Sequence, residues 1–253
     1  MMFQDMTWLL LLIGFMVGLV VGATGVGGGA LMTPLLIALT PTPLVSIIAT
    51  DLLFAAAIKI VVSFRNLRRN SIDWNIVRSL WIGAIPATLV FSFFLAVLFP
   101  SWLDASLALI IGALVIFAGF RFLSDNGQRQ APISRKHLPF IGAILGGSVS
   151  LTSIGAGAFG MALLRPHWPH TKHVSGLVAT DIVQAIPIAL LAGLVHLSTG
   201  TFDFGLFLAI TPTGVIGALL GSLVIAKTTS QSLMKILGLM LVTAGLLAVV
   251  AIF

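Results

Sequence analysis

Long runs of apolar residues separated by short polar breaks constrain this chain more than any other feature. Apolar segments occur at 8–22, 30–39, 44–64, 76–98, 103–123, 138–153, 158–164, 173–197, 205–225 and 232–252. Crossing a hydrocarbon core about 30 Å thick takes roughly 20 apolar residues in a helix. Hydrophobic residues fill 58% of the 253 positions and charged residues only 8%, which leaves too little polar surface for a water-soluble fold. We therefore expect an all-α integral membrane protein.

The segments differ in length in a pattern that occurs twice. Three segments in each half are long enough to span a bilayer: 44–64, 76–98 and 103–123, then 173–197, 205–225 and 232–252. Two shorter segments open each half and flank a glycine-rich break, at 24–29 in the first half and 153–158 in the second. Because a helix rises 1.5 Å per residue, arms of roughly 10 to 16 residues fall short of a crossing. We expect each pair to form a re-entrant or broken helical hairpin.

The two halves resemble each other at an offset of about 130 residues. This offset pairs Ala-Thr-Asp-Leu at 49–52 with Ala-Thr-Asp-Ile at 179–182, and Ser-Ile-Asp-Trp at 71–74 with Thr-Phe-Asp-Phe at 201–204. After a gap of four, Gly112 and Gly119 pair with Gly238 and Gly245. The sequence therefore predicts a duplication, with an N-terminal repeat at 1–123, a cytoplasmic linker at 124–137 and a C-terminal repeat at 138–253.

The basic residues predict the topology. Lys and Arg occur around 65–78, in the linker, and around 165–172 and 227–235, whereas the breaks near 40–43, 100–102 and 198–203 hold none. Cytoplasmic loops of membrane proteins carry an excess of Lys and Arg, so we expect an inner-membrane protein with both termini in the periplasm. Three crossings plus one hairpin make an odd number, which inverts the second repeat relative to the first. Basic residues placed singly at segment ends do not form a nucleic-acid-binding face.

The glycine-rich breaks are the first candidates for substrate contact. Irregular backbone at membrane depth is tolerated only where protein or a wet cavity satisfies its polar groups. Glycines let the backbone approach a ligand closely, and free N–H groups at the start of the next helix attract anions. The alternative is that the glycines serve tight helix packing. The candidate substrate-binding residues at the breaks are Thr24, Gly25, Gly27, Gly28, Gly29, Ser153, Gly155 and Gly157.

Two acidic residues, Asp51 and Asp181, lie inside apolar spans at equivalent positions of the two halves. An ionised carboxylate unpaired in lipid is costly, so each needs a cavity, a partner or a proton. One interpretation is that either residue exchanges a proton during transport. The other is a structural role, in which the carboxylates bind backbone groups freed at the breaks. Thr50 and Thr180, next to them in the chain, are candidate substrate-binding residues that fit either interpretation.

Lys59 is the one basic residue deep in a predicted span, about two turns beyond Asp51. Pairing with an anionic substrate is one interpretation, and we favour the other, in which its side chain snorkels to the inner interface near Arg65. The chain has no cysteine, which excludes disulfides, thiolate nucleophiles and cysteine-based metal sites. The histidines at 167–173 lack a metal-ligand spacing, so the sequence predicts no metal site and no cofactor.

A family resemblance rests on Gly-Val-Gly-Gly-Gly-Ala-Leu-Met-Thr-Pro-Leu-Leu at 25–36, followed by Pro43 and 49–52. This segment resembles the signature of the TauE/SafE family of membrane anion transporters, and the loop at 70–74 after a basic cluster is similar too. The resemblance extends through both halves. It implies a bacterial membrane transporter of sulfite, sulfonates and related sulfur-containing anions.

Together these features predict a secondary transporter, and an exporter in particular, of a small anion by alternating access between inverted repeats. No Gly-x-x-x-x-Gly-Lys-[Ser/Thr] motif occurs, so the energy would come from an ion gradient or a partner protein. The expected partners are a small anionic substrate, the lipid bilayer and a coupling proton or ion, and a homo-oligomer stays open. A passive anion channel is the alternative. We expect no enzymatic activity. An intramembrane aspartyl protease is a further alternative, but duplication explains the two Ala-Thr-Asp motifs without catalysis, and neither Asp follows a Gly-x-Gly. A protease would need the two carboxyls within hydrogen-bonding distance.

Overall fold

The computed structural model describes residues 2–25, 28–66, 72–98, 101–124, 134–165, 168, 174–224 and 231–251, and these residues form helices and short connections without a strand. The predicted all-α fold is therefore confirmed. The long helices are α1 (Met2–Thr24), α3 (Leu44–Asn66), α4 (Trp74–Phe93), α5 (Asp104–Leu123), α8 (Val174–Ser198), α9 (Phe204–Val224) and α10 (Gln231–Val250). The shorter ones are α2 (Gly29–Leu39), α6 (Leu138–Thr152), α7 (Gly160–Leu164), the π-helices η1 (Phe94–Leu98) and η4 (Gly155–Phe159), and the 3₁₀-helices η2 (Ser101–Leu103) and η3 (Arg135–His137).

Six of the described helices are long and apolar enough to cross a membrane. Their apolar stretches are Thr7–Thr24, Leu44–Phe64, Trp74–Leu98, Asp104–Leu123, Gly176–Ser198 and Phe204–Leu223. The chain is therefore a multi-pass membrane protein. The distribution differs from the prediction at one helix: α1 has 23 residues, and its apolar stretch Thr7–Thr24 is long enough to span. Helix α10 has 20 residues, Gln231–Val250, and agrees in length with the predicted segment at 232–252.

Small residues set three close helix pairs: α1 with α9, α4 with α6, and α5 with α10. A methyl group on Gly18 of α1 would collide with the Gly214 carbonyl oxygen of α9, and one on Gly146 of α6 with the Ala84 carbonyl oxygen of α4. Backbones this close require glycine, which is a common way for helices to associate in lipid. These glycines therefore serve helix packing. From the sequence we considered that role only for the glycines at the breaks.

The close contacts occur in related pairs. Gly14 of α1 lies against Ile210 of α9, and Gly142 of α6 lies against Leu80 of α4. Between α5 and α10, Gly112 lies against Gly245 and Gly119 against Gly238. The contacts are related by the sequence repeat. Gly14 and Ile210 correspond to Gly142 and Leu80, and Gly112 and Gly119 correspond to Gly238 and Gly245. The opposite membrane orientation of the halves, and their division at 124–137, stay predictions.

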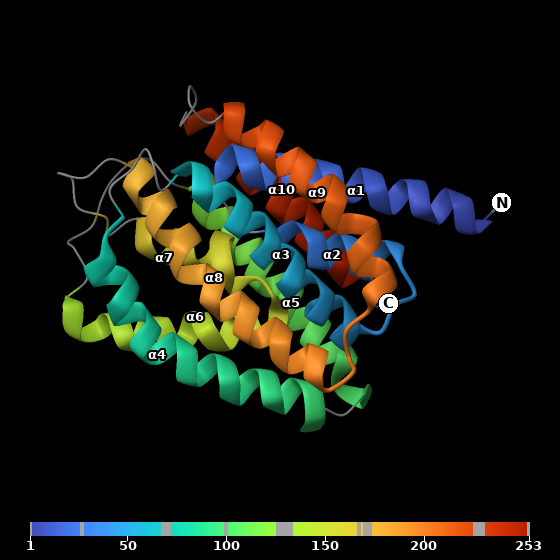
Figure 1. Cartoon of the computed structure of the whole chain (residues 1–253), viewed down its shortest axis with the longest axis horizontal. Coiled ribbons are helices and arrows are strands. Elements are labelled where there is room, and N and C mark those ends of the chain that lie inside the picture. Colours follow the sequence, from blue (N-terminus) through green and yellow to red (C-terminus); the bar gives the residue numbers. More distant parts are fainter. Residues whose placement is uncertain are drawn as a thin grey trace.

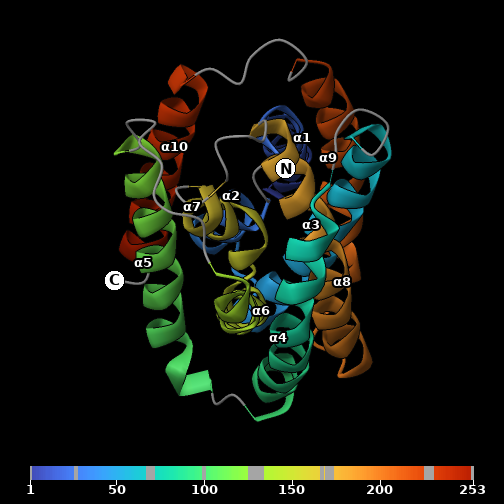
Figure 2. The same cartoon turned by 90° about the vertical axis from the view of Figure 1, so that its left-hand side faces the viewer.

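The second arms of the two predicted hairpins, α2 and α7, lie in the middle of the protein (Figure 2). Figure 2 shows α2 and α7 between the α5–α10 pair on one side and α3, α4, α8 and α9 on the other. In Figure 1, α1 begins and α10 ends toward one end of the molecule, whereas α3 ends and α8 begins toward the opposite end. The segments that the sequence marks as functional therefore lie inside the bundle. The membrane side that each end faces stays a prediction.

Candidate functional site

The two helix breaks have the same backbone geometry, and they differ in the residue at the turn, which is glycine in the first and serine in the second. Helix α1 ends at Thr24, and Gly25 then takes a left-handed conformation with φ 72° while its N–H donates to the Val21 carbonyl at 2.8 Å. Helix α6 ends at Thr152, and Ser153 takes φ 59° while its N–H donates to the Val149 carbonyl at 2.7 Å. The second break is therefore at Ser153 and Ile154. Gly155 and Gly157, predicted to form it, lie just after it in the π-helix η4.

The two breaks touch each other inside the protein. A methyl group on Gly29, the first residue of α2, would collide with the carbonyl oxygen of Ser153. At Gly28 the added carbon would lie 3.2 Å from the ring of Phe54, which is fully buried. The Thr24 hydroxyl donates to the Val20 carbonyl at 2.8 Å. Gly27 lies outside the described residues.

Asp51 on α3 lies at this junction and is fully buried. The Thr33 hydroxyl on α2 donates to Asp51 Oδ2 at 2.5 Å. Ser153 lies beside the same carboxylate, but its Oγ completes no hydrogen bond of standard geometry within the described part of the chain, and neither does Asp51 Oδ1. Three oxygen-bearing side chains from α2, α3 and the second break thus converge, with two oxygens unpaired.

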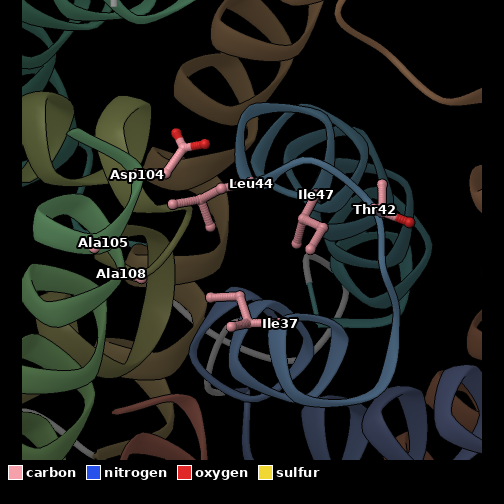
Figure 3. A pocket seen from close by; sticks show the side chains of 7 residues that line it. All are labelled: Ile37, Thr42, Leu44, Ile47, Asp104, Ala105 and Ala108. Carbon is pink, nitrogen blue, oxygen red and sulfur yellow. The ribbon is translucent and has the colours of Figure 1, made fainter. Parts of the chain in front are cut away.

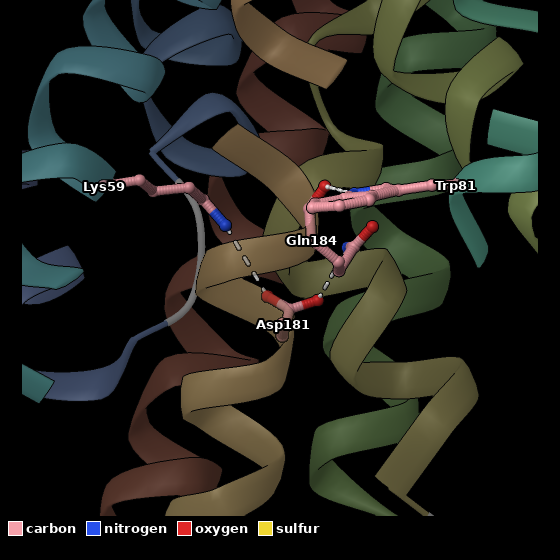
Figure 4. A network of polar contacts seen from close by, with 4 residues as sticks. All are labelled: Lys59, Trp81, Asp181 and Gln184. Carbon is pink, nitrogen blue, oxygen red and sulfur yellow. Dashed lines mark hydrogen bonds and ion pairs between the residues drawn. The ribbon is translucent and has the colours of Figure 1, made fainter. Parts of the chain in front are cut away.

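Asp181 on α8 meets different chemistry from that of Asp51 (Figure 4). Its Oδ2 lies 3.6 Å from Nζ of Lys59 on α3, with side-chain exposures of 0% and 1%. Its Oδ1 accepts from Gln184 Nε2 at 3.3 Å. The favoured prediction that Lys59 snorkels toward Arg65 is therefore wrong: α8 packs on α3 and brings a counter-charge to Lys59 inside the bundle.

Gln184 and Trp81 extend this network, and the sequence analysis missed both. Trp81 Nε1 on α4 donates to the Gln184 backbone carbonyl at 3.0 Å, which ties α4 to α8 (Figure 4). The signal for Gln184 was available, because it is a polar residue one turn beyond Asp181 in an apolar span. Nothing in the sequence marks Trp81, since aromatic residues are common in such helices.

Thr50 and Thr180 do not join either carboxylate site. The Thr50 hydroxyl accepts the backbone N–H of Asp203 at 3.3 Å, and the Thr180 hydroxyl accepts that of Asp73 at 3.0 Å. Asp73 and Asp203 in turn accept backbone N–H groups in the first turns of α4 and α9. The two threonines therefore hold α3 and α8 to the starts of these helices, an arrangement that matches between the halves.

The two carboxylates do not form a catalytic dyad. No hydrogen bond joins Asp51 to Asp181 among the described residues, since each has its own partners on other helices. Within that same part of the chain no group of three or more His, Cys, Asp or Glu could hold a metal ion. His167, His170 and His173 lie outside it.

A cavity of about 190 Å³ opens where α2 ends and α3 and α5 begin (Figure 3). Its lining is Ile37, Thr42, Leu44, Ile47, Asp104, Ala105 and Ala108. None of the predicted site residues lines it. However, Thr33 and Asp51 lie one helical turn deeper than Ile37 and Ile47 on the same helix faces. The cavity therefore approaches the Asp51 junction from the end of the molecule where the chain begins and ends.

Comparison with known proteins places this architecture in a family. The chain is 29% identical over 252 residues to "Probable membrane transporter protein YjnA" of Bacillus subtilis (strain 168), covering 94% of this chain and 97% of that protein. It is 26% identical over 204 residues to "Probable membrane transporter protein MJ0441" of Methanocaldococcus jannaschii, covering 77% and 73%. No solved structure matches the chain. Residues 10–250 match the family described as "Sulfite exporter TauE/SafE", and the protein therefore belongs to this family of membrane transporters.

Proposed function

We propose that the protein is a secondary transporter that exports a small anion, namely sulfite, a sulfonate or a related sulfur-containing organic anion. Transport proceeds by alternating access between the two halves. The family description supports the sulfur-containing anion, and the names of the relatives support transport. The observation that carries the proposal is the buried ammonium group of Lys59 in the middle of the bundle.

Lys59 has the properties of an anion-binding group. Its ammonium carries three N–H donors, and Nζ makes no hydrogen bond to the described residues. The 3.6 Å separation from Asp181 leaves an ion pair without a hydrogen bond. A sulfonate or sulfite oxygen that accepts from Lys59 gains a charge-assisted hydrogen bond that Asp181 does not make.

Asp181 keeps the binding of the anion reversible. Without substrate it balances the charge of Lys59, so the pair carries no net charge. A substrate anion competes with this carboxylate, which limits its affinity and allows its release on the other side. Export of an anion also follows the membrane potential, which contributes about 2.3 kcal/mol per charge per 100 mV.

A liposome assay tests the proposal. Purified protein is reconstituted, and the flux of radiolabelled sulfite, an aliphatic sulfonate and acetate is measured against concentration. We expect saturable flux of the sulfur-containing anions. The double variant Lys59→Met/Asp181→Leu removes both charges and leaves no unpaired ion. Its flux should be at least tenfold lower than that of the unchanged protein, an effect of about 1.4 kcal/mol or more.

The exposed Lys235 on α10 offers a matched control. Lys235→Met also removes one lysine, and it should transport as the unchanged protein does. Saturable flux in the folded double variant would overturn the role of Lys59. Flux that rises linearly with concentration would instead identify a passive anion channel.

A further inference from the structure

Ser153 adopts a left-handed backbone conformation that is unfavourable for a residue with a side chain. It is the one non-glycine residue with positive φ in the described segments. The corresponding residue after α1 is Gly25, which adopts the same conformation without a side chain in the way. A side chain is disfavoured in the left-handed region, and such strain is concentrated at functional sites. The hydroxyl of Ser153 is what this position has and a glycine would lack.

That hydroxyl belongs to a buried cluster of oxygens. Ser153 is 2% exposed, and Asp51 and Thr33 are fully buried. Thr33 Oγ1 is bonded to Asp51 Oδ2, while Asp51 Oδ1 and Ser153 Oγ have no hydrogen-bond partner in the part of the chain that the structure describes. Ser153 lies close enough to influence the Asp51 carboxylate, yet its Oγ completes no hydrogen bond of standard geometry with it. Buried polar atoms are nearly always paired, and one ligand between these two oxygens would satisfy both.

The electrostatics of the cluster call for a positive charge. Among the described residues, no Lys, Arg or His forms an ion pair with Asp51. Lys59 is paired with Asp181 on α8 instead. Ser153 caps the C-terminal end of α6, where the helix dipole adds partial negative charge. Broken helices in transporters bind sodium ions at such C-terminal ends.

The ligand set selects the kind of cation. Carboxylate and hydroxyl oxygens are hard ligands, which disfavours soft transition metals. One carboxylate neutralises one positive charge, whereas calcium sites surround the ion with several acidic oxygens. The cavity at Ile37 and Ile47 lies one turn above Thr33 and Asp51, and the carboxylate of Asp104 at its lining favours the approach of cations.

We propose that Asp51, Thr33 and Ser153 form a binding site for a monovalent cation of the size of sodium. Asp51 supplies the charge, and the hydroxyl oxygens of Thr33 and Ser153 complete the inner ligands. The site is separate from the Lys59–Asp181 pair, and it stands whether or not the anion assigned above is correct. It would let a sodium gradient act on the junction between the two breaks.

Thermal unfolding of the full chain in detergent tests the site without any anion substrate. Melting temperatures are compared in about 100 mM NaCl, KCl and choline chloride at one pH, so that ionic strength is constant. We expect a rise of roughly 3–8 °C in NaCl over choline chloride, which saturates with concentration. Equal melting temperatures in NaCl and choline chloride, or a response to pH alone, would overturn the proposal.

Ser153→Gly distinguishes a role of Ser153 in cation binding from a role in the stability of the fold. Glycine fits the left-handed backbone, so this variant should be at least as stable as the unchanged protein in choline chloride, yet it should lose most of the sodium response. Asp51→Asn should lose the response entirely. The matched control is Ser150→Ala, one turn earlier on α6, whose hydroxyl bonds the Thr88 and Gly146 carbonyls and which should keep the response.

Each outcome of these variants is decisive. A sodium response that survives in Ser153→Gly would overturn the assignment, as would its loss in Ser150→Ala at an unchanged melting temperature in choline chloride. A sodium response that is lost in Ser153→Gly and kept in Ser150→Ala supports the cation site and does not bear on the liposome test of Lys59. Failure of anion flux with an intact sodium response would remove the anion assignment and keep the cation site.

Discussion

Asp51 and Asp181 occupy the same place in two copies of an Ala-Thr-Asp motif, yet their side chains meet different chemistry. Asp51 bonds the hydroxyl of Thr33 and lies beside Ser153, so its surroundings are neutral oxygens. Asp181 pairs with Lys59 and Gln184, so its charge is balanced by a lysine. The same motif therefore has a carboxylate among neutral oxygens in one half and an ion pair in the other.

The comparison shows where the two halves are alike and where they diverge. The backbone contacts of Thr50 and Thr180 match, as do the glycine contacts of the paired helices. The divergence comes from single side chains that lack an equivalent. At the offset that pairs Asp51 with Asp181, the position that matches Lys59 is Ala189, which has no charge. Packing is therefore shared, while the charge of each interior site is specific to its half.

Separating Lys59 from Asp181 should have the largest effect on stability. Lys59→Met leaves the Asp181 carboxylate buried without a counter-charge, which should reduce the free energy of unfolding by about 3–5 kcal/mol. The double variant Lys59→Met/Asp181→Leu should recover most of that loss. Steric trapping in bicelles measures both values, and a double-mutant cycle with near-zero coupling would show that the pair contributes nothing.

Asparagine at the two acidic positions tests the comparison directly. Asp51→Asn keeps an acceptor for Thr33 and unpairs no cation, so in sodium-free buffer it should change the free energy of unfolding by no more than about 1 kcal/mol. Asp181→Asn leaves Lys59 as an unpaired buried cation and should cost about 3 kcal/mol or more. Equal losses in the same unfolding assay would mean that the two sites do not differ in their charge balance.

The smallest effects should come from the two threonines, and they should be equal. Thr50→Val and Thr180→Val keep the side-chain shape but remove the acceptor for the N–H groups of Asp203 and Asp73. Each loss should cost about 1 kcal/mol, the usual contribution of one hydrogen bond. Unfolding measured as above checks this, and a difference of more than about 1 kcal/mol between them would show that the matching contacts are not equivalent in energy.

The sequence by itself determined the membrane class, the all-α fold and the family. Apolar runs and scarce charge exclude a soluble fold whatever the packing, because they act through transfer into lipid. The motif at 25–36 indicates the family, and Asp51, Asp181 and Ser153 are candidate site residues from their place in the sequence alone. The expected short first segment was wrong because helix α1 continues beyond the predicted run at both ends, so that its apolar stretch covers Thr7–Thr24.

Only the tertiary structure decided which side chains meet. The pairing of Lys59 with Asp181 depends on how α3 and α8 pack, and the contact of Gly29 with Ser153 on how α2 crosses the end of α6. The left-handed conformation of Ser153 likewise carries no sequence signal, since serine rarely adopts it. Hydropathy predicts which segments are buried in lipid. It does not predict how far each helix is rotated or shifted along its neighbours, and these two quantities set the contacts of a buried charge.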